Sequence, residues 1–247
     1  MFALGVKVES YTKDGAINVA KDFLHSEKQA KIYTINPEMI VRAQKDEYFK
    51  QVLNTGDVNT CDGFGLKLFF NLKRVTGVDF MLDICKLAAE QEKSIYLLGS
   101  GSEDVVKKTA ENLQKQFPNL KIAGYNKGPK IEELRINNYE LIIADNETIL
   151  NKINNFSTDI LFVAFGMSKQ EKWIHENLAK IPKVKIAMGV GGSFDYISGA
   201  VPRAPLFLRR IGLEWMYRLI IQPKRLIRII NATIVFTWLV IKSKYYD

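Results

Sequence analysis

The chain is 247 residues long, 47% of them hydrophobic and 25% charged, with a formal net charge of +8. This balance indicates one globular domain, alone or with an appendage, and it excludes a disordered chain, a collagen-like repeat and a coiled coil. Two cysteines and two histidines are too few for a disulfide framework, a zinc site or a histidine-built metal centre, so a metal hydrolase is not expected.

Short apolar runs alternate with amphipathic stretches along most of the chain. The first strand is predicted at residues 31–36, followed by a helix over 37–53, because a proline and then an acid are typical of a helix start. Further strands are predicted at 94–99, 121–125, 159–165 and 183–190, with a clear helix at 103–117. Strand, glycine turn and helix in repetition predict an α/β fold with a mostly parallel sheet, which binds ligands at the carboxyl ends of its strands.

Asp62 follows a predicted strand and lies between a polar loop and two glycines, Gly63 and Gly65. A carboxylate in such a loop can point into a cleft. The neighbouring Cys61 is predicted to be a packed small side chain, since no histidine lies near it in sequence to activate it as a nucleophile. The pattern Asp-x-Asp is absent from the chain, which counts against a sugar-nucleotide site bridged by a divalent metal.

Two other strand ends allow a local structural explanation as readily as a functional one. Residues 98–103 resemble half of a dinucleotide fingerprint but lack its third glycine, so a tight turn explains them equally well. At 165–171, Gln170 could hydrogen-bond a polar ligand at a helix N-terminus. The alternative is a capping box, in which Ser168 is the N-cap and Glu171 lies three residues on.

The strongest of the glycine-rich strand ends contains Gly189, Gly191 and Gly192. Three glycines in four residues let backbone N–H groups approach a phosphate, and a bare turn would rarely need so many. Asp195 follows them and could accept a hydrogen bond from a ribose hydroxyl or a base N–H. These residues are therefore candidates for a nucleotide site.

The charge is concentrated at the C-terminal end. Residues 200–247 hold nine basic and two acidic side chains, whereas the first 199 residues are nearly neutral. Apolar residues interleave with the arginines, which indicates a membrane surface or an acidic ligand; the alternative is a solvated basic face on a pair of helices. Nucleic acid is a poorer candidate, because the rest of the chain adds no basic stripe.

We therefore divide the chain into a core, residues 1–199, and a basic, apolar C-terminal appendage, residues 200–247. Pro223 is predicted to end one helix and begin another, on which Arg225 and Arg228 share a face. The apolar run 229–241 is shorter than the roughly 20 residues that a spanning helix needs, so it is expected to be interfacial or buried. Because the N-terminus does not resemble a signal peptide, the protein is expected in the cytoplasm, peripheral on the inner face of the cell membrane.

Seven short motifs together resemble the WecG/TagA/CpsF family of glycosyltransferases, glycosyltransferase family 26, over about residues 5–230. In chain order they are Thr34-x-Asn36-x-Glu38, Asp62-Gly63-x-Gly65, Arg74-Val75-Thr76-Gly77-x-Asp79, Gly166-x-x-Lys169-Gln170-Glu171, Gly189-Val190-Gly191-Gly192-x-Phe194-Asp195, Gly199-x-x-x-Arg203-Ala204-Pro205 and Gly212-Leu213-Glu214-Trp215-x-Tyr217-Arg218.

The resemblance implies a Rossmann-like core and an inverting, metal-independent enzyme with no cofactor. Such an enzyme moves a sugar from a UDP-sugar donor to a polyprenyl-diphosphate-linked sugar. In one branch the donor is UDP-N-acetylmannosamine and the acceptor is undecaprenyl-diphosphate-linked N-acetylglucosamine, in teichoic acid and cell-wall synthesis. Other branches use N-acetylmannosaminuronic acid or glucose. The resemblance also implies self-association into a homo-oligomer.

The resemblance further implies roles for individual residues. Asp62 matches the proposed catalytic base, and Thr34, Asn36 and Gln170 match residues of the sugar pocket. Arg74 matches a contact to the acceptor or its phosphates. The proposed arginines that close over the UDP diphosphate match Arg218, Arg225 and Arg228. Without a metal, arginines and backbone amides would have to stabilise the charge that develops on the departing diphosphate.

Two rival classes remain at this point. A nicotinamide-dependent oxidoreductase needs Gly-x-Gly-x-x-Gly after its first strand, and the turn at Gly99 lacks the third glycine. A non-catalytic membrane-docking module would explain the appendage but would leave the Asp62 loop and the glycine-rich strand end without a use.

Overall fold

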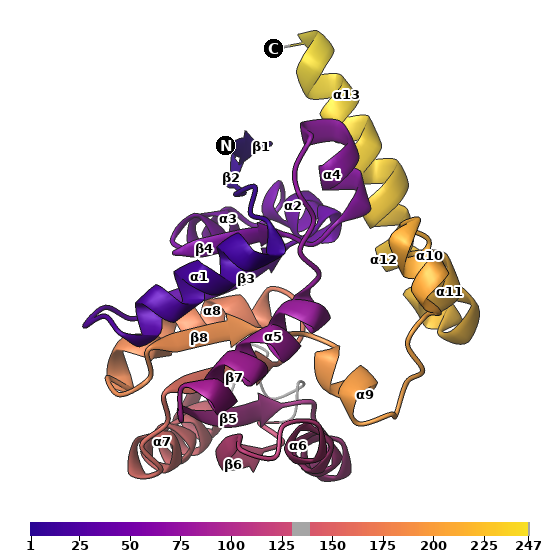
Figure 1. The fold of residues 1–247 in the computed structure, drawn as a ribbon. Coiled ribbons are helices and arrows are strands. Elements are labelled where there is room, and N and C mark those ends of the chain that lie inside the picture. Colours follow the sequence, from indigo (N-terminus) through magenta and orange to yellow (C-terminus); the bar gives the residue numbers. More distant parts are fainter. Residues whose placement is uncertain (130–138, 247) are drawn as a thin grey trace.

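The computed structural model describes residues 1–129 and 139–246 (Figure 1). Within them, six strands form one sheet in the order β4-β3-β8-β7-β5-β6, and every neighbouring pair is parallel. The strands are β3 (Ala30–Ile35), β4 (Val58–Cys61), β5 (Ser94–Gly99), β6 (Lys121–Asn126), β7 (Ile160–Ala164) and β8 (Ile186–Gly189). A short antiparallel pair, β1 (Phe2–Ala3) and β2 (Val6–Lys7), precedes them. The predicted Rossmann-like α/β fold is confirmed.

Helices cover both faces of this sheet. One face packs against α1 (Lys13–Leu24), α5 (Gly77–Glu90), α6 (Glu103–Gln116) and α9 (Ser193–Ile197). The other packs against α2 (Pro37–Ala43), α3 (Glu47–Asn54), α7 (Tyr139–Asn155) and α8 (Lys169–Asn177), which a 3₁₀ turn at Leu178–Lys180 follows. A further short helix, α4 (Phe64–Phe70), lies beyond the end of β4.

Alternation along the strands explains the two cores. In β3, Tyr33 and Ile35 point into one hydrophobic cluster, whereas Ala30 and Ile32 point into the other. Strands buried on both faces read as continuous apolar runs, which is why β5 and β7 could be recognised in the sequence.

The predicted strands lie within a few residues of their observed positions, but the helix expected over 37–53 is wrong. The structure has two helices there, α2 and α3, with a break at residues 44–46. The break occurs because Asp46 starts a new helix: its Oδ1 accepts a 2.9 Å hydrogen bond from the backbone N–H of Phe49.

The C-terminal segment is helical and lies beside α2 and α4 (Figure 1). It comprises α10 (Leu206–Arg210), α11 (Glu214–Ile221), a 3₁₀ turn (Pro223–Arg225), α12 (Leu226–Ile230), a π-helical turn (Asn231–Val235) and α13 (Phe236–Tyr246). The predicted break at Pro223 is confirmed, since α11 ends just before it. The division of the chain at residue 199 stays a prediction.

From Pro223 onward the segment forms one helix of 22 residues, Pro223–Lys244, whose most apolar window has a mean hydropathy of 1.6 and is 11% buried. By length and composition alone this helix could cross a membrane, so the expectation that the segment is too short to do so was wrong. It also packs on the body of the protein, because Phe236 and Val240 are each only 1% exposed and belong to one of the two cores. Other apolar side chains of the helix remain exposed, among them Ile227, Ile234 and Trp238.

Candidate active site

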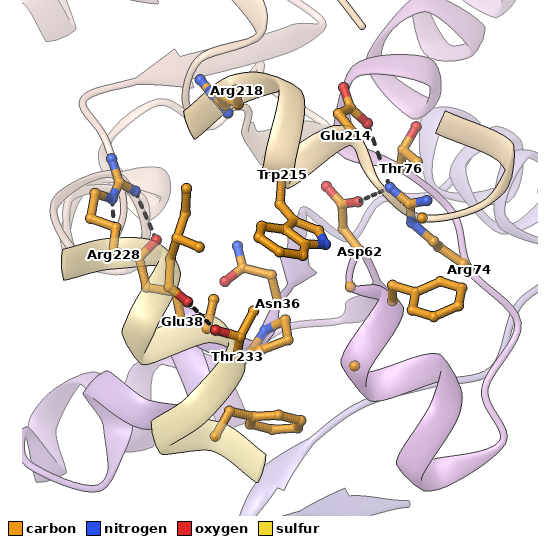
Figure 2. Close-up of a pocket in the computed structure, with 18 of the residues that line it drawn as sticks. Asn36, Glu38, Asp62, Arg74, Thr76, Glu214, Trp215, Arg218, Arg228 and Thr233 are labelled. Carbon is orange, nitrogen blue, oxygen red and sulfur yellow. Dashed lines mark hydrogen bonds and ion pairs between the residues drawn. The ribbon is translucent and has the colours of Figure 1, made fainter. Parts of the chain in front are cut away.

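Two adjoining cavities lie at the carboxyl ends of the strands. The strand-end cavity, of about 330 Å³, is lined by Thr34, Gly77, Gln170, Gly191 and Asp195, among others. The helix-side cavity, of about 400 Å³, lies between α2, α4 and the C-terminal helices and is lined by Glu38, Leu68, Phe69, Trp215 and Phe236, among others (Figure 2). Both cavities share the residues Asn36, Asp62, Val78, Tyr196, Arg218, Arg225 and Arg228.

Asp62 therefore lies where the two cavities meet. Its backbone N–H donates to the carbonyl of Ile35, which ties the end of β4 to the end of β3. Its Oδ2 accepts a 2.9 Å hydrogen bond from the N–H of Gly77, the first residue of α5, and its Oδ1 lies 3.9 Å from Nη2 of Arg74. A helix N-terminus is a favourable neighbour for a carboxylate, so α5 both holds and orients this side chain.

Burial raises the pKa of Asp62 to about 6, although Arg74 and the Gly77 N–H both favour the charged form. Glu214 and Asp79, two nearby carboxylates, raise the pKa further. A carboxylate with this pKa is ionised at neutral pH and can still take up a proton, which is what a general base requires.

The two residues predicted for the sugar pocket lie on different elements, Thr34 in β3 and Asn36 at the N-cap of α2. Thr34 lies near the end of β3 and lines the strand-end cavity. Asn36 caps α2, since its Oδ1 accepts a 3.0 Å hydrogen bond from the N–H of Met39, and it lines both cavities. Both therefore line the same cavity as Asp62, and their role in a sugar pocket stays a prediction.

Gln170 lines the strand-end cavity, but its amide is engaged within the protein. Its Nε2 donates a 2.7 Å hydrogen bond to Oε1 of Glu171, and its Oε1 accepts a 3.0 Å hydrogen bond from the N–H of Gly191. The capping interpretation also holds, because the N–H of Ser168 donates to Oε2 of Glu171 at 2.7 Å. Through these bonds the Gln170 side chain links the start of α8 to the turn after β8.

The glycine-rich turn after β8 lies against the same side chains. Gly191 has a φ of +51° and places its N–H on Gln170, so this amide is already paired. A Cβ on Gly189 would lie 2.8 Å from Nε2 of Gln170, and one on Gly192 would lie 2.7 Å from Nη2 of Arg218. Gly189 and Gly192 therefore let this turn pack closely against Gln170 and Arg218. Asp195 follows in α9, and burial raises its pKa.

The three predicted arginines of the appendage converge on both cavities. Arg228 forms a two-pronged ion pair with Glu38, with N–O distances of 2.8 and 3.0 Å (Figure 2). The guanidinium of Arg218 lies over the ring of Tyr196, 4.9 Å from its centre, while its buried Nε and Nη2 have no hydrogen-bond partner in the described residues. Burial, together with Arg218 and Arg228, lowers the pKa of Arg225 to about 10. Like charges brought together in this way favour a bound anion.

Arg74, the last of the predicted residues, lies at the edge of the helix-side cavity and belongs to a network of charges. Its Nη2 is 3.6 Å from Oε2 of Glu214, and its Nη1 donates to the carbonyl of Arg209 at 3.2 Å. Arg203 continues the network, 3.8 Å from Glu214 and 2.7 Å from Asp79.

Sequence reasoning gave Glu171 only a capping role and assigned no role to three other charged residues of the site, Glu214, Arg203 and Asp79. Each of them lies within a motif that resembles the family, and this position in a motif was the only indication in the sequence of a functional role. The ion pairs of Glu214, Arg203 and Asp79 join residues distant in sequence, so they could not be foreseen. Among the described residues, no group of three or more His, Cys, Asp or Glu side chains is placed to hold a metal ion.

Comparison with known proteins gives consistent matches. The sequence model of the Glycosyl transferase WecG/TagA/CpsF family matches residues 1–246. A protein of Bacillus subtilis (strain 168) is 33% identical over 217 residues, which cover 85% of this chain and 79% of the relative. One of Staphylococcus aureus (strain NCTC 8325 / PS 47) is 30% identical over 251 residues, which cover 98% of this chain and 92% of the relative. Both relatives are named N-acetylglucosaminyldiphosphoundecaprenol N-acetyl-beta-D-mannosaminyltransferase.

Proposed function

The chain belongs to the WecG/TagA/CpsF family of glycosyl transferases, and we propose that it transfers N-acetylmannosamine from a UDP-sugar to N-acetylglucosaminyl-diphosphoundecaprenol. The names of the relatives from Bacillus subtilis and Staphylococcus aureus support this pair of sugars and this lipid. The placement of Asp62 between two cavities is the single observation that carries the proposal, because a transferase must bring a donor and an acceptor to one base.

In this proposal Asp62 is the catalytic base of an inverting transfer. An acceptor hydroxyl attacks the anomeric carbon from the face opposite UDP, the bond from that carbon to the diphosphate oxygen breaks, and the hydroxyl proton passes to Asp62. The bonding electron pair leaves with UDP. The pKa of about 6 supports this role, because Asp62 is then ionised before the reaction at neutral pH.

The donor would occupy the strand-end cavity, with its diphosphate near the arginines of the appendage. Arg218 supports this placement, since its buried donors lack partners among the described residues and lie beside Gly192. The lowered pKa of Arg225 points the same way, because a diphosphate would relieve the repulsion among the three guanidinium groups. Thr34, Asn36 and Gln170 would border the sugar, and the turn at Gly189, Gly191 and Gly192 would border the diphosphate, with Asp195 beside it.

The acceptor would occupy the helix-side cavity, whose lining suits a lipid-linked sugar diphosphate. Arg74 and Arg203 lie at its polar side, and Leu68, Phe69 and Phe236 at its apolar side. The apolar side would receive the first part of the polyprenyl chain. This arrangement supports a donor and an acceptor that approach Asp62 from different directions.

We further propose that the reaction needs no metal and that the protein docks on the inner face of the cell membrane. The positive charge beside the leaving diphosphate would come from arginines, which can stabilise it without a metal. The exposed Phe207 and Trp238, together with the basic residues of the appendage, support docking on an anionic lipid surface. Self-association of the chain stays a prediction.

The test is to incubate the purified protein with a panel of UDP-sugars and a short-chain lipid-diphosphate-N-acetylglucosamine and to measure UDP release, with and without chelator. We expect release with UDP-N-acetylmannosamine that survives chelation and disappears in Asp62→Asn. Release with only another UDP-sugar would reject the proposed donor but retain the reaction type. UDP binding without release from any donor would favour the membrane-docking module.

A further inference from the structure

Arg74 lies between two carboxylates that belong to different parts of the fold. Its Nη2 is 3.9 Å from Oδ1 of Asp62, at the end of β4, and 3.6 Å from Oε2 of Glu214, the first residue of α11 (Figure 2). Both carboxylates compete for the same nitrogen, and neither is within normal hydrogen-bond distance of it. The guanidinium is thus held at an intermediate position.

The position of Arg74 is fixed by both its backbone and its side chain. Residue 74 forms a parallel bridge with Cys61, and the N–H of Val75 donates to the carbonyl of Cys61 at 2.9 Å. At the other end of the side chain, Nη1 donates to the carbonyl of Arg209 in α10 at 3.2 Å. With its backbone anchored beside Asp62, Arg74 needs only a small side-chain movement to reach that carboxylate.

Glu214 is held from its other side as well. Its Oε1 is 3.8 Å from Nε of Arg203, whose Nη1 forms a 2.7 Å ion pair with Oδ1 of Asp79 in α5. The Glu214 side chain is 19% exposed, so its charge is only partly screened by water. Through Arg203, Glu214 therefore links the α10–α11 segment to the N-terminal turn of α5, and it attracts Arg74 at the same time.

We propose that Glu214 is a positioning residue that holds the Arg74 guanidinium away from Asp62 when the α10–α11 segment is in place, and so keeps Asp62 free to accept the acceptor proton. This inference rests on the proposed role of Asp62 as the base. If Glu214 is neutralised or α11 is displaced, Arg74 pairs with Asp62 alone. The base then forms an ion pair that the reacting hydroxyl must disrupt.

The charges around Asp62 give the sign of the expected change. Arg74 lowers its pKa, whereas Glu214 and Asp79 raise it, and burial is the largest contribution. Asp79 is itself engaged by Arg203 and lies 3.9 Å from Arg209. On the far side of the cavity, Arg228 is paired with Glu38. Loss of the Glu214 charge removes one raising influence and lets Arg74 approach, so both effects lower the pKa of Asp62.

The decisive measurement follows the Asp62 carboxyl directly, by ¹³C NMR titration of protein labelled at aspartate. The Asp62 signal is assigned by its loss in Asp62→Asn. In Glu214→Gln we expect its midpoint to fall by about one pH unit, with kcat reduced by about tenfold and the KM for donor changed much less. Glu111→Gln, on the exposed side of α6, is the matched control and should leave the midpoint and kcat unchanged.

A double-mutant cycle then tests whether Glu214 acts through Arg74. In an Arg74→Gln background, Glu214→Gln should shift the Asp62 midpoint far less than it does in the wild type. An equal shift in both backgrounds would overturn the proposal. Glu214→Asp keeps the charge on a shorter side chain and should recover part of the wild-type midpoint, which loss of folding would not explain.

The titration does not depend on turnover, so the positioning role of Glu214 and the proposed function can be tested separately. An Asp62 midpoint that does not move in Glu214→Gln would overturn the positioning role even if the protein transfers sugar. A shifted midpoint in a protein that transfers no sugar would support the coupling among the three residues and reject the proposed function.

Discussion

The backbone N–H of Gly77 donates a hydrogen bond of 2.9 Å to Oδ2 of Asp62. The donor is the first residue of α5, so the carboxylate is held at the N-terminus of a 14-residue helix. A Cβ at this position would lie 3.0 Å from Oγ1 of Thr34 and 3.2 Å from the same Oδ2. Both contacts are tighter than most Cβ contacts in proteins, so α5 approaches the site closely at a glycine.

Gly77→Ala should displace Asp62 or Thr34 by a few tenths of an ångström. Because proton transfer depends on geometry, we expect kcat to fall by about tenfold, with UDP affinity little changed. Gly15→Ala is the matched control, since a Cβ there would lie 3.0 Å from Thr12 Oγ1, near the start of another helix and outside both cavities. Steady-state kinetics with both variants check this, and equal losses in the two would contradict it.

Activity should depend on the ionisation of Asp62. Because its pKa is about 6, kcat/KM should fall as the pH drops through that value, where the carboxylate becomes protonated and can no longer accept a proton. Asp62→Asn should lower kcat by about 10²–10⁴-fold while UDP still binds. The exposed Asp104 provides the control variant, Asp104→Asn. Residual activity in Asp62→Asn with an unchanged pH profile would show that another group is the base.

The three arginines of the appendage should differ in their importance for UDP binding. Arg218 has two buried donor nitrogens without partners in the described residues, whereas Arg228 is already neutralised by Glu38. We expect Arg218→Gln to weaken UDP binding by about 10–100-fold and Arg228→Gln by less, since charged hydrogen bonds contribute about 1.5–3 kcal/mol. Calorimetric titration with UDP measures both. The reverse order would mean that the diphosphate displaces Glu38 from Arg228.

Stability should depend on pH through Glu171. This side chain is 1% exposed, and burial raises its pKa to about 7 despite hydrogen bonds from Gln170 and Ser168. The folded protein therefore keeps a proton that the unfolded chain has already lost, so the free energy of unfolding falls as the pH rises from 4.5 to about 7. The contribution is on the order of 3 kcal/mol.

Glu171→Gln should make this part of the stability profile flatter, because the amide does not titrate. The raised pKa of Asp62 also makes the free energy of unfolding fall as the pH rises, at somewhat lower pH than Glu171 does. This effect is present in both the wild type and Glu171→Gln. Urea unfolding at several pH values between 4 and 8 gives the two profiles, with Glu111→Gln as the exposed control. Parallel profiles for wild type and Glu171→Gln would show that folding does not shift the pKa of Glu171.

The sequence predicted the strands that are buried on both sides, because β5 and β7 consist almost entirely of apolar residues. It did not give the extent of β4, whose sequence is Val-Asn-Thr-Cys. Asn59 in that strand is buried yet polar, and its Nδ2 donates hydrogen bonds to the carbonyls of Lys7 and Leu53. A polar residue that finds its partners only in the folded protein carries no periodic signal.

The candidate site was predictable to the extent that glycines and motif positions indicate it. Asp62 could be found from its neighbours in sequence, and the structure places it at the junction of the cavities. The pairing of Gln170 with Gly191, and of Arg74 with Glu214, could not be found in that way. Each pair joins two segments that are distant in sequence and that only the folded chain brings together.

The helix-side cavity has walls from two sources: Asp62 and Leu68 come from the body, and Arg228 and Phe236 from the C-terminal helix. A small molecule that fills this cavity contacts both the body and the C-terminal helix, so it binds only those chains in which the helix is packed against the body. Its apparent affinity is then its intrinsic affinity multiplied by the fraction of chains in which the helix is packed against the body. An inhibitor of this kind would report how often the enzyme is assembled, and any change that loosens the helix would confer resistance without altering a single contact to the drug.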